Sequence, residues 1–131
     1  MWDGMAYDPD AQLVYVGTGN AEPWAQQLRI VAGQGQPAYV CSILAVHVDT
    51  GELKWHYQVV PGDIWDFDSV QHLILADLTI DGRLRKVIMQ ANKNAFYYVI
   101  DRITGQFISA QPIFTSHVGQ GDRSRRPDGR S

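Results

Sequence analysis

Polar side chains that can hold a metal cation gather in three segments, each following an apolar stretch typical of a strand. The first is Gly17-Thr18-Gly19-Asn20, the second runs from Pro61 to Asp68 and includes Asp63, Asp66 and Asp68, and the third is Asn92-Lys93-Asn94. Carboxylate and amide oxygens are hard ligands that suit Ca²⁺ or a trivalent cation of similar size. Histidine and cysteine do not recur at the spacing of a zinc site. The three segments are therefore candidates for one shared oxygen-rich site.

The composition is that of a globular domain without a nucleic-acid partner. Of the 131 residues, 45% are apolar and 19% are charged, and the formal net charge is −3. No long basic run precedes the C-terminal segment, so nucleic-acid binding is not expected. No window approaches about 18 apolar residues, which predicts no membrane span. The first residues lack the basic and apolar regions of a signal peptide.

The elements that must position these side chains read as short strands. Apolar stretches with alternating pattern are punctuated by turn residues about every ten positions, which is typical of an all-β sandwich, barrel or propeller. The segment 22–32 is expected to be a loop with a helical turn or two. Strands are expected at 13–16, 39–48, 53–60, 72–78, 85–90, 95–100 and 106–109.

An internal repeat favours the propeller. The segment 43–55 is echoed by 96–108, and both contain an apolar strand, an Asp, a Thr-Gly turn and a further strand. The two Thr-Gly pairs lie 54 residues apart, which is close to the span of one four-stranded blade. Residues 1–114 are therefore predicted to form a partial β-propeller of about two blades, with Trp55 and Trp65 in its core. A closed propeller needs roughly four to eight blades.

The last segment, 115–131, departs from the repeat and is predicted to be a disordered tail. From residue 116 onward it has no aromatic residue, and four arginines fall within eight positions: Arg123, Arg125, Arg126 and Arg130. Such a composition cannot bury enough apolar surface to order the chain. A basic tail that binds an acidic partner and an out-of-frame translation are the alternatives.

Three motifs in order resemble the family of alcohol dehydrogenases that depend on pyrroloquinoline quinone (PQQ), the quinoproteins and quinohemoproteins. They are the run from Trp2 to Pro9, the run from Tyr15 to Asn20, and Trp65-Asp66-Phe67. The Thr-Gly…Trp repeat is similar to the tryptophan-docking motif that locks each blade of that family to the next. The resemblance extends from about Trp2 to Ile113. It implies two four-stranded blades of an eight-bladed propeller with PQQ on its axis.

The resemblance also implies roles for individual residues. Trp2 matches the indole that stacks under the PQQ rings, and Lys93 matches a basic residue that hydrogen-bonds the reactive quinone oxygens. Asn20 matches a metal ligand. Asp66 matches the carboxylate that contacts the metal and, as general base, takes the proton of a primary alcohol during its oxidation to an aldehyde. The parent enzyme would be periplasmic and would pass electrons to a cytochrome c or a quinone.

Asp68 bears on the choice of metal. Calcium-type members of the family carry a small or hydroxyl residue two positions after the base, whereas lanthanide-type members carry Asp there. Two carboxylates at i and i+2 of one strand would face the same side, and the second would help to balance a 3+ ion. Asp68 is therefore predicted to be a metal ligand, and it favours a lanthanide over Ca²⁺. The family glutamate that completes the metal site, and the vicinal disulfide near PQQ, belong to earlier blades.

Two other functions compete with the dehydrogenase. A non-catalytic propeller, used as a scaffold or interaction module as in bacterial outer-membrane assembly, would carry the same Thr-Gly…Trp repeat. It would have no reason to gather Asn20, Asp66 and Lys93. A nonfunctional truncated reading frame is the third reading, because two blades supply only part of the family's site.

Overall fold

A computed structural model of the chain describes residues 3–23, 25–31 and 38–114. The tail at 115–131 lies outside these residues. Within the described parts the chain forms short strands and one short helix. Their bounds are β1 Ala6–Asp8, β2 Leu13–Gly17, α1 Gln26–Val31, β3 Ser42–His47, β4 Leu53–Gln58, β5 Ile74–Ile80, β6 Arg83–Ala91, β7 Phe96–Asp101 and β8 Phe107–Pro112.

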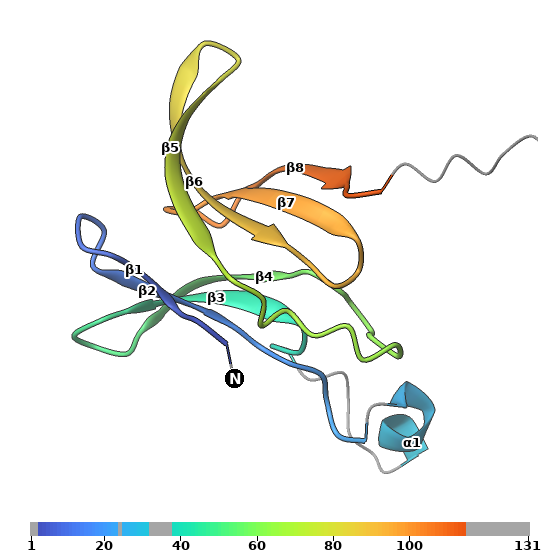
Figure 1. Cartoon of the computed structure of the whole chain (residues 1–131). Helices are drawn as coiled ribbons and strands as arrows, with labels where there is room; N and C mark the ends of the chain where they lie inside the picture. The colour runs from blue at the N-terminus through green and yellow to red at the C-terminus, as the bar shows by residue number, and fades with distance from the viewer. Residues whose placement is uncertain (1–2, 24, 32–37, 115–131) are drawn as a thin grey trace, which may run out of the picture.

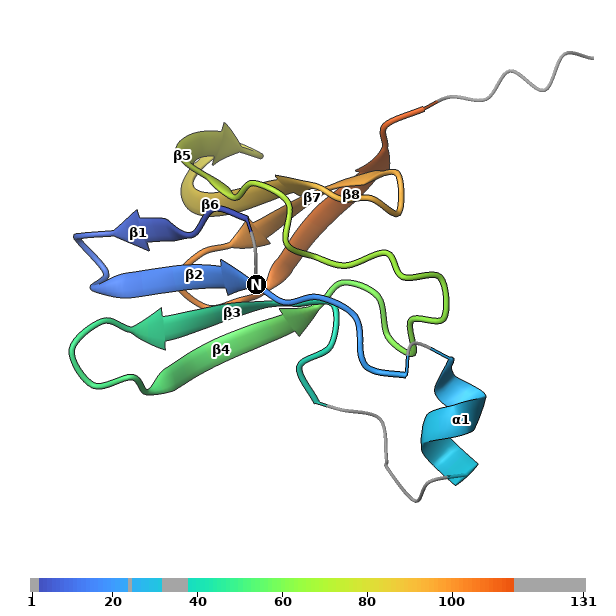
Figure 2. The ribbon, with the colours of Figure 1, turned by 60° about the horizontal axis from the view of Figure 1, so that its bottom comes forward.

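The strands make two four-stranded antiparallel sheets, ordered β1-β2-β3-β4 and β5-β6-β7-β8 (Figure 1). Every strand pairs with its neighbour in the sequence, and the first strands of the two sheets, β1 and β5, contact each other. In the turned view α1 projects away from both sheets (Figure 2). Successive four-stranded meanders packed side by side are the blades of a β-propeller. The prediction of an all-β chain with two such blades is confirmed.

The strand boundaries differ from expectation for local reasons. The three-residue strand β1 was not predicted, because so short a stretch shows no alternation. The strand expected from residue 39 begins only at Ser42, since Cys41 has the left-handed φ of 47° and interrupts the extended backbone. The helical turn expected within 22–32 is α1.

The 54-residue repeat extends to individual hydrogen bonds. Gly51 N–H donates to His47 O at 2.9 Å, and Gly105 N–H donates to Asp101 O at 2.8 Å. Both glycines have positive φ, 69° and 75°. The ladder of each sheet shifts register at the same place, after Ala45 in the first blade and after Val99 in the second. The two turns are therefore copies of one structural unit.

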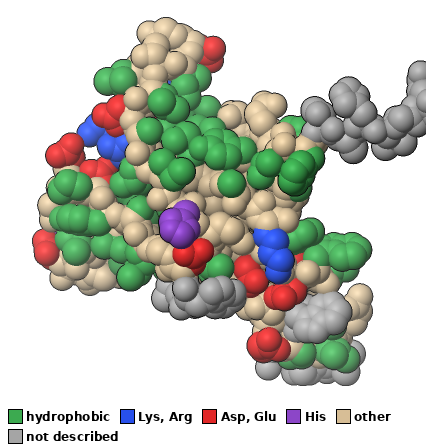
Figure 3. Space-filling model, viewed as in Figure 1, with side chains coloured by type: hydrophobic (Ala, Val, Ile, Leu, Met, Phe, Trp, Pro, Cys, Tyr) green, Lys and Arg blue, Asp and Glu red, His purple; other side chains and the backbone are tan. Residues whose placement is uncertain are grey.

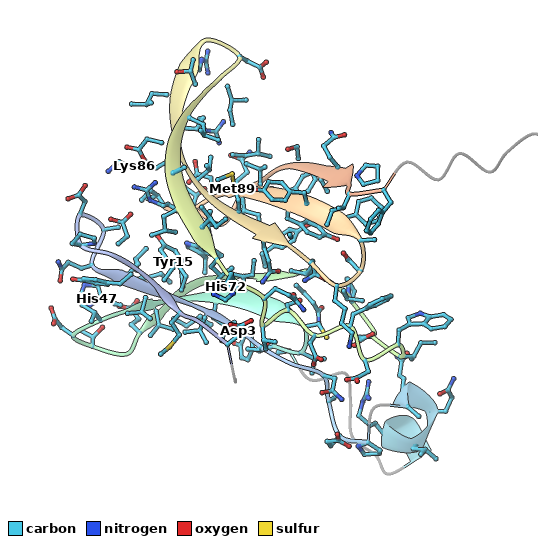
Figure 4. All side chains as sticks on the ribbon, in the orientation of Figure 1. Asp3, Tyr15, His47, His72, Lys86 and Met89 are labelled. Atoms are coloured by element: carbon cyan, nitrogen blue, oxygen red, sulfur yellow. The ribbon has the colours of Figure 1, made fainter. Side chains whose placement is uncertain are left out.

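Buried apolar side chains from both sheets form one core, so the blades are held together by packing as well as by the chain. Tyr15 lies between the sheets (Figure 4), and its hydroxyl donates to Arg102 O at 2.8 Å. The buried Trp55 indole donates to the same carbonyl at 3.0 Å. The core comprises Leu13, Tyr15, Ile43, Ala45, Trp55, Val59, Ile88, Tyr98 and Ile100.

A buried arginine links the two blades at β1 and β5. The Arg102 guanidinium donates to Asp8 Oδ2 at 2.6 Å, to Asp77 Oδ1 at 2.7 Å and to Ala76 O at 2.8 Å. Burial alone would raise the pKa of Asp8. The hydrogen bonds from Arg102 and from the amides of Ala11 and Asp10, with the charge of the guanidinium, outweigh burial and lower that pKa below its ordinary value.

The second sheet leaves apolar surface uncovered. Phe96, Phe107 and Phe114 are exposed, and hydrophobic side chains gather over β6, β7 and β8 in the space-filling view (Figure 3). Isolated exposed apolar residues are common, but a gathered patch marks a surface that is normally covered. Among the described residues no helix is long and apolar enough to cross a membrane.

Candidate active site

The three polar segments lie at the same end of the two sheets (Figure 1). Because neighbouring strands of the first sheet are antiparallel, β2 and β4 end on one side, and β6 of the second sheet ends on that side too (Figure 1). Backbone bonds join the first two segments, since Ser69 N–H donates to Thr18 O at 2.9 Å. A Cβ on Gly17 would lie 2.0 Å from Ser69 O, so only glycine allows this close approach.

Asn20 meets the second segment through its backbone. Its N–H donates to Asp68 Oδ1 at 2.7 Å, while its side-chain nitrogen faces Ala21 O at 3.4 Å. The side chain is partly exposed. The bond to Asp68 holds the backbone of Asn20 beside one carboxylate of the pair.

Lys93 joins both carboxylates. Its Nζ lies 4.0 Å from Asp66 Oδ2 and 3.8 Å from Asp68 Oδ2, and it also donates to the backbone carbonyl of Asp66. One oxygen of each acid therefore faces a single cation, here the lysine ammonium. The structure thus brings together Asn20, Asp66, Asp68 and Lys93. Trp2 lies outside the described residues, and its neighbour Asp3 contacts His72, with Oδ1 and Nδ1 3.3 Å apart (Figure 4).

The expected reason for the pairing of Asp66 and Asp68 is wrong. They lie in the connection between β4 and β5, not on a strand, and both have left-handed φ, 59° and 58°. The side chain of Asp66 is 54% exposed, whereas that of Asp68 is 10% exposed. A left-handed conformation costs a non-glycine residue about 1–3 kcal/mol. Two instances in one loop, separated only by Phe67, require specific partners that hold them.

A buried carboxylate supplies such partners. Asp63 Oδ1 accepts from Trp65 N–H at 2.9 Å, and Asp63 Oδ2 accepts from Phe67 N–H at 3.0 Å and from the Cys41 thiol at 3.1 Å. Hydrogen bonds to a charged acceptor contribute about 1.5–3 kcal/mol each, enough to offset the left-handed backbone. Trp65 itself is 71% exposed, so its predicted place in the core is wrong, whereas Trp55 is buried as expected.

Buried amides support the loop from the other side. Gln90 Nε2 donates to Ser69 O at 2.9 Å and to Gln71 O at 3.0 Å. Asn92 Nδ2 donates to Ser69 Oγ at 3.1 Å, and Asn92 Oδ1 accepts from Asn94 N–H at 3.1 Å. Asn92 therefore fixes both the turn that carries Lys93 and the loop that carries Asp68.

Sequence reasoning did not assign a role to Asp63 or Gln90. The signal for Gln90 is its place on β6 two residues after the buried Ile88, where alternation predicts an apolar side chain. Asp63 lies within the second polar segment, but nothing in the sequence set its role apart from that of Asp66 and Asp68.

The residues present fit a hard cation in part. Asp66 and Asp68 offer carboxylate oxygens and Asn20 an amide oxygen, and one oxygen of each acid already faces the Lys93 ammonium. Ca²⁺ takes about 6–8 oxygen ligands. Among the described residues no cluster of three or more His, Cys, Asp or Glu side chains could hold a metal alone. Further ligands would have to come from outside this segment.

Two adjacent four-stranded blades, docked through a tryptophan and carrying acids and a lysine at one end, define a segment of a β-propeller. The chain belongs to the PQQ family described as glucose/ethanol/alcohol dehydrogenase, beta-propeller domain, which matches residues 1–125. The family resemblance expected from the motifs is confirmed. The match includes residues 115–125 of the segment predicted to be a tail.

The curated relatives include quinohemoprotein alcohol dehydrogenases. The chain is 57% identical over 111 residues to quinohemoprotein alcohol dehydrogenase ADH IIB of Pseudomonas putida, covering 85% of this chain and 16% of the relative. It is 47% identical over 130 residues to the quinohemoprotein alcohol dehydrogenase of Comamonas testosteroni, covering 98% of this chain and 18% of the relative. The chain therefore spans less than a fifth of these proteins.

Solved structures agree. Quinohemoprotein alcohol dehydrogenase ADHIIG of Pseudomonas putida HK5 superposes with a TM-score of 0.81 at 53% identity, over 87% of this chain and 16% of that one. A europium-containing methanol dehydrogenase gives a TM-score of 0.81 at 40% identity, over 88% of this chain and 19% of that one.

Proposed function

We propose that this chain is the two-blade segment of a PQQ-dependent alcohol dehydrogenase that carries the catalytic base and part of the metal site. The observation that carries the proposal is the convergence of Asp66, Asp68 and Lys93, with both acids within 4.0 Å of the ammonium. A non-catalytic scaffold has no need for two left-handed acids facing one cation. The family membership supports the same conclusion.

Asp66 is the proposed general base. Its carboxylate is about half exposed, so a small alcohol can reach it, whereas Asp68 is nearly buried and bonded to Asn20 N–H. A positioned base within hydrogen-bond reach of the substrate hydroxyl contributes typically about 10²–10⁴ in rate. The exposed carboxylate is therefore the one that takes the proton, and the buried one supports the site.

Trp2 and Lys93 are the residues proposed to hold the cofactor, Trp2 by stacking and Lys93 by donating to quinone oxygens. PQQ with its metal, when bound, supplies an electron-poor quinone that accepts hydride from the alcohol carbon. Lys93 has a half-exposed side chain, and its backbone turn is fixed by Asn92. A cation in this place would stabilise negative charge that develops on a bound quinone.

The proposed metal ligands in this chain are Asn20, Asp66 and Asp68, and the metal is Ca²⁺ or a lanthanide. The second carboxylate favours a lanthanide, because it adds a negative charge beside a 3+ ion. The likeness to a europium-containing methanol dehydrogenase supports this preference.

The proposed electron acceptor of the whole enzyme is a cytochrome c or a quinone, and its proposed location is the periplasm. Support for the acceptor comes from the names of two relatives, one of which includes cytochrome c and the other quinone. One is 1-butanol dehydrogenase (cytochrome c) of Thauera butanivorans, 49% identical, and another is alcohol dehydrogenase (quinone) of Gluconobacter oxydans, 44% identical.

A segment exchange tests the function. ADH IIB of Pseudomonas putida would receive this chain in place of its matched 111 residues, giving a chimeric dehydrogenase. After loading with PQQ and Ca²⁺ or La³⁺, ethanol-dependent dye reduction is expected. Asp66→Asn should lower kcat about 100-fold or more. The control is Asp49→Asn, an exposed acid at the opposite end of the blade. A folded chimera without activity, or full activity in Asp66→Asn, would contradict the proposal.

A further inference from the structure

Asp63 is a buried acid that the proposed reaction does not use. It is 4% exposed, and both of its oxygens point at donors within the protein: Trp65 N–H, Phe67 N–H and the Cys41 thiol. Oxygens already occupied by two amides and a thiol are poorly placed to bind a metal or a substrate. The role of Asp63 must therefore be exerted through the groups that it binds.

The groups that Asp63 binds flank Asp66. The N–H of Phe67 belongs to the peptide unit that follows Asp66, and Asp63 accepts it at 3.0 Å. Lys93 donates to the carbonyl oxygen of that same peptide unit. Both ends of one peptide are thus held, by a buried acid on one side and by the site lysine on the other. Holding this peptide fixes the ψ angle of Asp66, whose φ is 59°.

The anchor of Asp63 is the start of β3. The Cys41 thiol donates to Asp63 Oδ2 at 3.1 Å. Burial raises the pKa of this thiol to about 12, with a further contribution from Asp63, so the sulfur keeps its proton and remains a donor. Cys41 is itself fixed, since its N–H donates to Gly19 O at 3.0 Å and its carbonyl accepts from Val59 N–H at 2.8 Å. Asp63 therefore ties the loop of Asp66 to the segment that leads to Asn20.

We propose that Asp63 is a positioning residue of the site, which orients Asp66 and Asp68 by capturing the amides of Trp65 and Phe67. A turn former would need only the bond to Trp65, two residues away, which is a common Asx turn. The second bond, to Phe67, and the thiol go beyond that local turn. The catalytic consequence rests on the proposed function, whereas the effect on the backbone does not.

The first test measures the backbone directly in the full 131-residue chain. Asp63→Asn keeps the volume but removes one acceptor and the charge. Hydrogen exchange followed by NMR is expected to become at least about tenfold faster at the amides of Trp65 and Phe67. The amides of Thr18 and Val59, which bond to other carbonyls, should keep their rates. Unchanged exchange at Trp65 and Phe67 in a folded variant would overturn the proposal.

A second variant covers the case in which Asp63→Asn does not fold. Cys41→Ala removes only the thiol donor, so Asp63 loses its anchor but keeps both amides. Exchange at Phe67 should rise about threefold, and Cys41→Ser, which restores a donor, should bring it back toward the wild-type rate. Equal rates in all three proteins would count against the proposal.

The catalytic consequence is tested in the chimeric dehydrogenase. Asp63→Asn should lower kcat per PQQ-loaded molecule at least about tenfold while the KM for ethanol stays within about twofold and Tm within a few degrees. Asp49→Asn, the exposed control, should match the wild type. A merely structural residue would lower Tm and leave kcat per loaded molecule unchanged, which would overturn the positioning role. If the wild-type chimera is inactive, the proposed function fails, and the exchange measurement still decides whether Asp63 positions the loop.

Discussion

The indole of Trp55 packs directly on Gly105 of the neighbouring blade. A Cβ added to Gly105 would lie 2.8 Å from ring carbons of Trp55, closer than real Cβ contacts allow. The corresponding turn glycine of the first blade, Gly51, has nothing within 4 Å of its Cβ position. The Thr-Gly turn of the second blade is therefore covered by the Trp55 indole, whereas the same turn of the first blade has no neighbour within 4 Å of the Cβ position of its glycine.

This difference predicts unequal effects of one substitution. Gly105→Ala should lower the free energy of unfolding by about 2–4 kcal/mol, because it adds a clash with Trp55 to the cost of a left-handed alanine. Gly51 has nearly the same φ but no neighbour at its Cβ position, so Gly51→Ala should lower the free energy of unfolding by only about 1 kcal/mol. Urea denaturation of the full chain measures both values. Equal losses would show that Trp55 does not rest on Gly105.

Acid should weaken the link between the blades at Asp8. The folded-state pKa of this carboxyl lies below its unfolded value, so its contribution to stability is present above about pH 4 and is lost as pH falls through the folded pKa. Wild-type protein should therefore lose more unfolding free energy between pH 5 and pH 3 than Asp8→Asn. Denaturation curves at the two pH values test this. A variant as acid-sensitive as the wild type would place the pH dependence elsewhere, for example at Asp101, whose pKa is also lowered.

The sheets could be predicted from the sequence, because alternation and the Thr-Gly turns are local properties. The 54-residue spacing of Gly51 and Gly105 was enough to predict two blades. The Asp of the two repeats does not occupy the same position, however, because a 54-residue shift from Asp101 leads to position 47 and not to Asp49. The residue equivalent to Asp101 is His47, whose Nδ1 accepts from Asp49 N–H at 3.3 Å, much as Asp101 Oδ1 accepts from Ile103 N–H at 3.0 Å.

The site loop could be predicted only in part. The motif led to Asp66, Asp68 and Lys93, but the spacing of the two acids suggested a strand where the backbone is left-handed. That conformation depends on hydrogen bonds from residues far away in the sequence. One example is the bond from the Lys93 ammonium to the Asp66 carbonyl oxygen. Hydrophobic periodicity carries no information about such contacts. It could not show that Asp63 is buried and accepts a hydrogen bond from the Cys41 thiol, which is 22 residues away in the sequence.

Cys41 should be almost unreactive in the folded chain. It is fully buried, and burial together with the bond to Asp63 raises its pKa to about 12, so at pH 8 the thiolate is a minute fraction. Labelling by a disulfide reagent at pH 8 should be at least about 100-fold slower without urea than in denaturing urea. Asp63→Asn should speed the labelling of Cys41 in the folded chain, because the pKa of the thiol falls when the neighbouring carboxylate is replaced by a neutral amide. Rapid labelling of the native wild type would contradict the burial of this thiol.

Asp68 should decide which metal supports activity. Its Oδ1 is bonded to Asn20 N–H and its Oδ2 faces the Lys93 ammonium, so it serves both as a hydrogen-bond acceptor and as a charge. Asp68→Asn keeps an acceptor and removes the charge, whereas Asp68→Ala removes both. If the charge balances a 3+ ion, the ratio of La³⁺-supported to Ca²⁺-supported ethanol oxidation in the chimeric dehydrogenase should fall at least about tenfold in Asp68→Asn. Asp68→Ala should lose activity with either metal as well, since the Asn20 segment is released. An unchanged ratio in Asp68→Asn would mean that the second acid only shapes the loop, and the preference for a lanthanide would then have no support from this residue.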